Sequence, residues 1–354
     1  MNASHRSLAH ARDIWPGLLA AMVIAAAAAF LADHYAGPVM LFALLLGMAM
    51  NFISDVDRCR PGIGFAGRTL LRLGVALLGF RITLWEVAGL GWQPVALVIG
   101  VVTVTILASV WAAKAMGFKT EFGLLTGGAT AICGASAAMA VSAALPPDER
   151  KERLTGFTII GVSTLSTIAM ILYPIVSQLF RFGDHQAGLF IGATVHDVAQ
   201  VIGAGYAISP EAGDTATVVK LMRVAMLLPV IVAIGLWARS HGGPGEGVAD
   251  QKAPSSRQDR WNVRGGKAPP LLPWFVTAFA ALVVINSLVP IPEVVRDAGS
   301  TASRWCLVAA IAALGIRTQF REIVEIGWKP VALMIFETLL IAGLGLAAIA
   351  AGWI

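Results

Sequence analysis

The sequence predicts an all-α fold, a polytopic transmembrane helical bundle of about 11 helices. Of its 354 residues, 57% are hydrophobic and 13% are charged, whereas a soluble domain carries roughly 25% charged residues. About 20 apolar residues span the roughly 30 Å hydrocarbon core of a bilayer. Blocks of this order without an acid or a base exclude an ordinary soluble protein, and they occupy residues 14–32, 87–113, 122–147, 154–180 and 268–292.

A segment of 22 residues occurs twice, and it is the second observation behind this fold class. Residues 78–99 read LGFRITLWEVAGLGWQPVALVI, and residues 314–335 read LGIRTQFREIVEIGWKPVALMI. Without gaps, 11 of the 22 positions match, where chance gives roughly two. Repeated helix–loop–helix units near opposite ends of a membrane chain are typical of secondary transporters built from structural repeats.

Each span follows from one apolar segment, and the loops between spans predict the orientation. Lysine and arginine collect in cytoplasmic loops. With the N-terminus inside, 17 of the 26 Lys and Arg residues fall on the inside and 6 on the outside. This distribution favours a cytoplasmic N-terminus and an external C-terminus. The predicted spans are residues 14–32, 38–54, 64–84, 93–113, 121–145, 154–180, 187–207, 214–238, 271–290, 300–317 and 329–352.

The span count makes the two copies an inverted repeat. The duplicated segment joins spans 3 and 4 and again spans 10 and 11, and an offset of seven spans reverses the orientation. Three units are predicted along the chain. They are a membrane bundle at residues 1–239, a flexible cytoplasmic linker rich in Gly, Pro and Ser at 240–270, and a second bundle at 271–354 that repeats residues 38–113.

The chemistry is expected where polar groups interrupt a span, because an intramembrane charge is costly and usually functional. In span 7, His196 and Gln200 are candidate substrate ligands, because they are four residues apart and share a helix face. Asp197 follows His196 directly. Because histidine titrates near neutral pH, we expect His196 and Asp197 to couple an ion. The alternative is a buried His–Asp pair that only joins two helices.

Two cations lie in span 8. Lys220 and Arg223 are three residues apart and share a face. They predict an anionic substrate or a partner such as Asp197. If the span began later, both side chains would instead extend to the lipid headgroups.

Span 5 is rich in Gly, Thr and Ser, with Thr130, Cys133, Gly134 and Ser136 as candidate substrate ligands. Broken helices in transporters present free backbone N–H groups and a positive helix end to anions. The alternative is close packing of small residues between helices.

Asn51 and Asn286 are secondary candidates near span ends. The three cysteines form no CxxC pair, so no metal site and no disulfide framework is expected. No Walker A or HExxH sequence is present. We predict no second intramembrane carboxylate beside Asp197, which ranks an intramembrane enzyme or receptor last.

With these segments the chain resembles the YeiH-like family, also called the sulfate exporter family. The shared motifs include ICGAS ending at Ser136, HxVAQ beginning at His196 and KLxR beginning at Lys220. Asp197 stands where glutamate is expected in much of that family. The resemblance implies an inner-membrane transporter of ten or eleven helices. It also implies kinship with cation–proton antiporters and bile-acid symporters, in which discontinuous helices cross near the substrate.

Together with this resemblance, the sequence predicts a non-enzymatic secondary transporter that exports a small anion, such as sulfate or an organic sulfonate or carboxylate. The resemblance implies a location in the bacterial inner membrane. The expected coupling ion is H⁺ or Na⁺, with no other cofactor. The expected partners are the small anion, membrane lipid and a second copy in a homodimer, without nucleic acid. The alternative is a cation–proton antiporter in which Asp197 binds the ion and Lys220 is its salt-bridge partner.

Overall fold

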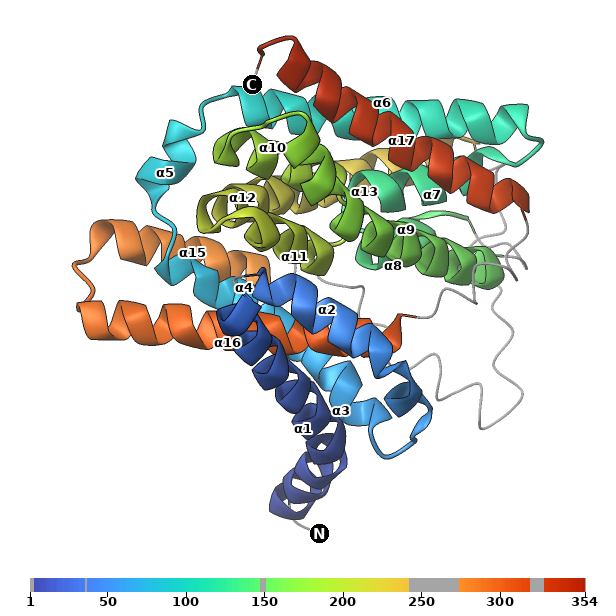
Figure 1. Cartoon of the computed structure of the whole chain (residues 1–354). Coiled ribbons are helices and arrows are strands. Elements are labelled where there is room, and N and C mark those ends of the chain that lie inside the picture. The colour runs from blue at the N-terminus through green and yellow to red at the C-terminus, as the bar shows by residue number, and fades with distance from the viewer. Residues whose placement is uncertain (1–2, 36, 147–150, 242–273, 319–327, 354) are drawn as a thin grey trace.

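The computed structural model describes residues 3–35, 37–146, 151–241, 274–318 and 328–353, and these residues contain helices but no strand. Two groups of helices are stacked in Figure 1. The lower group consists of α1 (Ala3–Tyr35), α2 (Val39–Ala49), α3 (Arg60–Phe65), α4 (Leu71–Leu77), α15 (Trp274–Leu288) and α16 (Glu293–Arg317). The upper group consists of α6 (Gln93–Ala115), α7 (Thr120–Ala131), α8 (Ala135–Ala144), α9 (Lys151–Leu179), α10 (Asp184–Thr194), α11 (Val198–Ile208), α12 (Pro210–Ala225), α13 (Leu227–His241) and α17 (Trp328–Ala350). The short helix α5 (Leu84–Gly89) connects the two groups.

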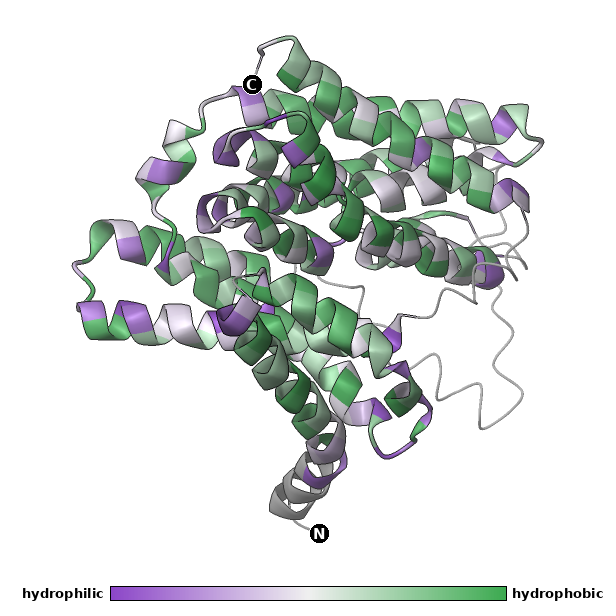
Figure 2. Cartoon of the chain, in the orientation of Figure 1, coloured by the Kyte–Doolittle hydropathy of each residue, from purple (hydrophilic) through white to green (hydrophobic). Residues whose placement is uncertain are grey.

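The predicted polytopic helical fold is confirmed. Among the described residues, seven helices are long and apolar enough to cross a membrane. Every predicted span coincides with one helix or with a run of consecutive helical segments. Spans 5 and 7 are interrupted, span 5 between α7 and α8 and span 7 between α10 and α11. Figure 2 shows hydrophilic residues mainly at helix ends and in α5, as a bilayer requires.

The last three predicted spans do not pack as one bundle. Helix α16 lies against α2 and α4, and α15 lies against α4, whereas α17 lies against α6, α7 and α10. The grouping in space therefore differs from the division at residues 239 and 271 along the chain. The predicted linker falls almost entirely outside the described residues.

The inverted repeat is visible in how the copies pair in the lower group. A Cβ placed on Gly67 would lie 3.9 Å from Ala313, and one on Gly74 would lie 2.8 Å from Leu307. Gly67 lies in the helical segment Ala66–Leu70, which leads directly into α4. The contact moves forward through this segment and α4 as it moves backward along α16, so these equivalent helices are antiparallel.

The following helices of the two copies, α6 and α17, pair in the same way in the upper group. The rings of Trp92 and Trp353 are 5.9 Å apart, and further along α6 the Ser109 hydroxyl meets Glu337. Both pairs of equivalent helices therefore run in opposite directions, as Figure 1 also shows. The opposite directions of the two copies therefore follow from these contacts alone, without the span count from which we predicted the inverted repeat.

A close backbone approach within the lower group joins α2 and α16. A Cβ on Gly315 would lie 2.4 Å from the carbonyl oxygen of Leu44 and 2.9 Å from the Cα of Gly47. Backbones approach this closely in membranes only through small residues.

We predict that Gly315→Ala destabilises the protein by about 1–3 kcal/mol, because the added methyl group overpacks this contact. Thermal unfolding of the detergent-solubilised protein measures the effect. Gly343→Ala on α17 is the matched control, because a Cβ there meets nothing within 4 Å. Equal melting temperatures for the two variants would contradict the packing described here.

Candidate functional site

Two helix breaks lie side by side inside the upper group. Residues 132–134 separate α7 from α8, and residues 195–197 separate α10 from α11. Gly134 has φ +69°, a conformation that favours glycine. We call the two breaks together the crossing, and it is the feature that the family resemblance implied.

Lys220 of α12 joins the two breaks. Its ammonium donates to the carbonyl oxygen of Ile132 at 2.7 Å, to that of Val195 at 3.0 Å, and to that of His196. The first oxygen belongs to one break and the other two belong to the second. One fully buried side chain therefore holds both interruptions.

Arg223, one turn further along α12, binds the ends of the preceding half-helices. Its Nε donates to Ala131 O at 2.9 Å. Its Nη1 donates to Gly192 O at 3.2 Å and Val195 O at 2.9 Å. Its Nη2 donates to Thr130 O at 3.1 Å and Ala131 O at 2.7 Å. These carbonyls lie at the C-terminal ends of α7 and α10, where a helix carries partial negative charge.

These hydrogen bonds use every N–H donor of the two cationic side chains. A lysine ammonium has three N–H groups and an arginine guanidinium has five, and the bonds above use all of them. Lys220 and Arg223 do share a buried face of α12, as predicted. However, the structure leaves neither residue a donor for direct contact with an anion.

His196 and Gln200 each keep one buried acceptor without a partner among the described residues. The His196 Nε2 lies 2.9 Å from the Thr338 hydroxyl, which itself donates to Met334 O. Nε2 therefore donates to Thr338, and Nδ1 is the open acceptor. The Gln200 Nε2 donates to Thr167 at 3.4 Å, and its Oε1 has no partner.

Asp197 begins α11 beside the other break. Its N–H donates to the Ser166 hydroxyl at 3.0 Å. A Cβ on Gly134 would lie 3.6 Å from Asp197 Oδ2, which places the carboxylate at the turn that starts α8. Among the described residues, Asp197 forms no ion pair with Lys220 within 4.0 Å. The predicted salt bridge between them is therefore absent.

The span 5 candidates divide between two roles. The Cys133 thiol lies 2.9 Å from the Ser136 hydroxyl, and Ser136 is exposed at the start of α8. The Thr130 hydroxyl instead donates to Glu337 Oε2 at 2.8 Å.

Glu337 of α17 is a second intramembrane carboxylate, so our prediction that none exists is wrong. It is fully buried. Its Oε1 accepts from Ser109 at 2.5 Å and from Thr126 at 2.7 Å. The sequence does contain a signal for it. Glu337 is a lone acid in the last apolar segment, at the position where the ungapped alignment of the two copies places Val101.

The secondary candidates lie elsewhere. The Asn51 amide donates to the carbonyls of Ile316 and Thr318 at the end of α16. The Asn286 amide, on α15, donates to Ile82 O. Both side chains stabilise the lower group, and neither is brought to the crossing.

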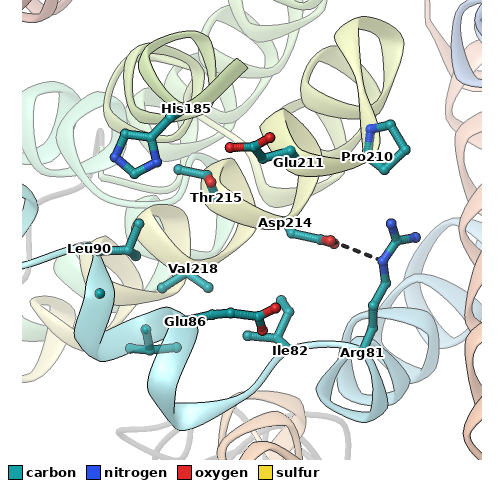
Figure 3. A pocket seen from close by; sticks show the side chains of 12 residues that line it. Arg81, Ile82, Glu86, Leu90, His185, Pro210, Glu211, Asp214, Thr215 and Val218 are labelled. Atoms are coloured by element: carbon teal, nitrogen blue, oxygen red, sulfur yellow. Dashed lines mark ion pairs between the residues drawn. The ribbon is translucent and has the colours of Figure 1, made fainter. Parts of the chain in front are cut away.

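A pocket of about 550 Å³ opens between the first repeat copy and α12. Figure 3 shows Glu86 of α5 on one wall and Glu211 and Asp214 of α12 on the other. Arg81 Nε lies 3.0 Å from Asp214 Oδ2, and the Tyr206 hydroxyl donates to Oδ1 of the same carboxylate. With one paired arginine among three carboxylates, the lining is acidic.

Comparison with known proteins agrees with this architecture. The family model described as Conserved hypothetical protein 698 matches residues 16–334, and the relatives that match carry the family designation UPF0324. The chain belongs to the UPF0324 membrane protein family. The resemblance to a YeiH-like family is thereby confirmed.

Three UPF0324 relatives cover almost the whole chain. UPF0324 membrane protein CT0845 of Chlorobaculum tepidum is 48% identical over 95% of this chain and 89% of its own length. UPF0324 membrane protein TauZ of Paracoccus pantotrophus is 49% identical over 93% of each chain. UPF0324 membrane protein RB0971 of Rhizobium meliloti is 46% identical over 92% of this chain and 90% of its own. No solved structure matches this UPF0324 protein.

Lys220→Met is expected to destabilise the protein by about 3 kcal/mol or more. Hydrogen bonds to a charged donor contribute about 1.5–3 kcal/mol each, and the carbonyls left behind are buried. Unfolding in detergent measures the loss. The matched control is Arg304→Met, which removes an exposed cation of α16. If Lys220→Met were as stable as this control, Lys220 would not be holding the crossing.

Proposed function

We propose that this UPF0324 protein is a secondary active transporter that exports a small anion, such as sulfate or an organic sulfonate or carboxylate. The observation that supports this most is the crossing of two discontinuous helices inside an inverted repeat. In transporters of this construction, substrate and coupling-ion sites lie where broken helices meet near the bilayer midplane.

The electrostatic field at the crossing favours the binding of an anion. The N-terminal turns of α8 and α11 begin there, and a helix N-terminus carries unpaired N–H groups and partial positive charge. The charges of Lys220 and Arg223 remain although their protons are engaged, and among the described residues of the two breaks Asp197 is the acidic group that opposes them. In this proposal the anion binds to N–H groups of α8 and α11 and to Ser136, while the two cations act through their field.

Alternating access follows from the two groups of helices. The crossing belongs entirely to the upper group, and its α11 contacts α2 and α16 of the lower group. In the proposed cycle the upper group moves against the lower group and exposes the crossing to each side in turn. The ion pair between Arg81 and Asp214 links the two groups and would open during this movement.

Coupling is assigned to His196 and Asp197. The unpartnered Nδ1 of His196 offers a site for a proton, and Asp197 offers a carboxylate for a proton or Na⁺ at the adjacent helix start. The proposal keeps the cytoplasmic N-terminus predicted from loop charges and the bacterial inner membrane that the resemblance implies.

A cation–proton antiporter with Asp197 as the ion-binding carboxylate is the second candidate. The acidic lining of the pocket formed by Glu86, Glu211 and Asp214 favours it, because such a lining concentrates cations. The saturation of Lys220 and Arg223 favours it as well. The missing ion pair between Asp197 and Lys220 opposes the form in which we predicted it.

The deciding experiment measures flux in proteoliposomes. Uptake of labelled sulfate, a sulfonate and a carboxylate is followed with and without gradients of pH and of sodium. We expect anion flux that depends on a gradient and that loses this dependence in His196→Ala. Gradient-independent flux with an undiminished His196→Ala variant would contradict the mechanism. Collapse of an imposed pH gradient by sodium without anion flux would establish the antiporter instead.

A further inference from the structure

Glu337 is a buried carboxyl group surrounded by hydroxyl groups. Its hydrogen-bond donors are Ser109 of α6 and Thr126 and Thr130 of α7. None of these is a cation, and no described ion pair within 4.0 Å includes Glu337. Burying a carboxylate without a countercharge costs much more than burying the neutral acid. The surroundings therefore permit protonation of this group.

The three hydroxyl groups can serve either protonation state. With the carboxylate ionised, each donates to a carboxyl oxygen. Ser109 Oγ also lies 2.8 Å from Gly123 O, and Thr126 Oγ1 lies 3.1 Å from Phe122 O. When Glu337 is protonated, Ser109 and Thr126 can donate to these helix carbonyls instead, and the carboxyl proton is donated to one of the released hydroxyl oxygens. Proton uptake therefore exchanges partners without leaving a group unpaired.

The close approach of α6 and α7 supports this cluster. A Cβ on Gly127 would lie 2.6 Å from the Ser109 Cβ, and one on Gly123 would lie 2.7 Å from Val110 Cα. The two glycines thus allow Ser109 to reach Glu337. The small residues of span 5 serve helix packing here, as one of our alternatives predicted.

Adjacent residues of α17 reach both halves of the crossing. Glu337 binds Thr130, whose carbonyl oxygen accepts from Arg223 at the end of α7. Thr338 binds His196 in the other break. In the aligned first copy these two positions are Val101 and Val102. The copies therefore differ where α17 contacts the crossing.

The other ionisable groups near Glu337 lie at the ends of the neighbouring helices or at the crossing. On the helices that pack against α17, the charged residues and the ionisable His185 all occupy terminal turns. At the crossing, His196 is hydrogen-bonded to Thr338, the residue that follows Glu337. Arg223 is connected to Glu337 through Thr130, whose carbonyl oxygen binds Arg223 and whose hydroxyl binds Glu337. Lys220, Asp197 and Cys133 lie beyond these contacts, and Tyr173 of α9 faces Phe190. The terminal-turn residues are Lys114 on α6, Glu121 on α7, Lys151, Glu152 and Arg153 on α9, and Asp184 and His185 on α10.

We propose that Glu337, with Ser109, Thr126 and Thr130, forms a reversible proton-binding site that controls how the end of α7 is held at the crossing. Uptake protonates one carboxyl oxygen and transfers the Ser109 and Thr126 donors to α7 carbonyls. Release returns these two donors to the carboxylate of α17, which then accepts from all three hydroxyls of α6 and α7. Its use in driving transport rests on the proposed function, whereas proton binding itself does not.

Infrared spectroscopy of the purified protein in lipid nanodiscs, without substrate, tests the site. We expect a C=O stretching band of a protonated carboxyl group that gives way to carboxylate bands as the pH is raised. Glu337→Gln should lose this titrating band entirely. Glu86→Gln, which removes an exposed carboxylate of α5, is the matched control and should retain it.

Three results would overturn the proposal: a titrating band that survives in Glu337→Gln, a band that does not change with pH, or no protonated band at any pH. Ser109→Ala provides a second variant if Glu337→Gln fails to fold. It keeps the carboxyl group and removes one partner, so it should shift the band, and an unshifted band would contradict the assignment. Absence of anion flux in proteoliposomes would overturn the proposed function and leave this titration unaffected.

Discussion

The structure depends on eight N–H groups of two side chains on α12. Lys220 and Arg223 direct all of them at carbonyl oxygens where α7 and α10 end. A bilayer offers no water to a broken helix, so each free carbonyl must find a donor within the protein. The cations also oppose the negative ends of both helix dipoles. Two interrupted helices can therefore coexist at one place inside the membrane.

This constraint changes the roles of the polar residues. Lys220 and Arg223 stabilise the crossing and contribute charge, and the open positions are the starts of α8 and α11 and the unpartnered atoms of His196 and Gln200. One of the duplicated segments is also connected to the crossing. The second copy continues into α17, which brings Glu337 to one break and Thr338 to the other.

Much of the fold could be predicted from sequence because bilayer thickness dictates the length of apolar segments. The inverted relation was predictable from the duplicated segment and the parity of the spans. The side chains at the crossing were also found, since His196, Asp197, Lys220 and Arg223 are polar groups within apolar spans. Their partners could not be found, because the donors of α12 bind carbonyls that lie between 24 and 93 residues earlier in the chain, and backbone acceptors leave no mark in a sequence.

Other features needed the structure for different reasons. Glu337 was overlooked because its partners are neutral hydroxyls on distant helices, so no charge pattern accompanies it. The separation of α17 from α15 and α16 could not be inferred from chain order, because packing partners depend on which faces fit together. The polarity of Asn51 near a span end is equally compatible with a binding role, whereas the structure shows that it binds backbone carbonyls at the end of α16.

Hydrogen exchange in Lys220→Met tests most directly whether one side chain of α12 holds both breaks. Each hydrogen bond to a charged donor contributes about 1.5–3 kcal/mol, and about 1.4 kcal/mol corresponds to a factor of ten in an equilibrium constant. Amide exchange at the ends of α7 and α10 should therefore accelerate at least about tenfold, in both segments together. Unchanged exchange in these segments, or acceleration confined to α12, would contradict this account.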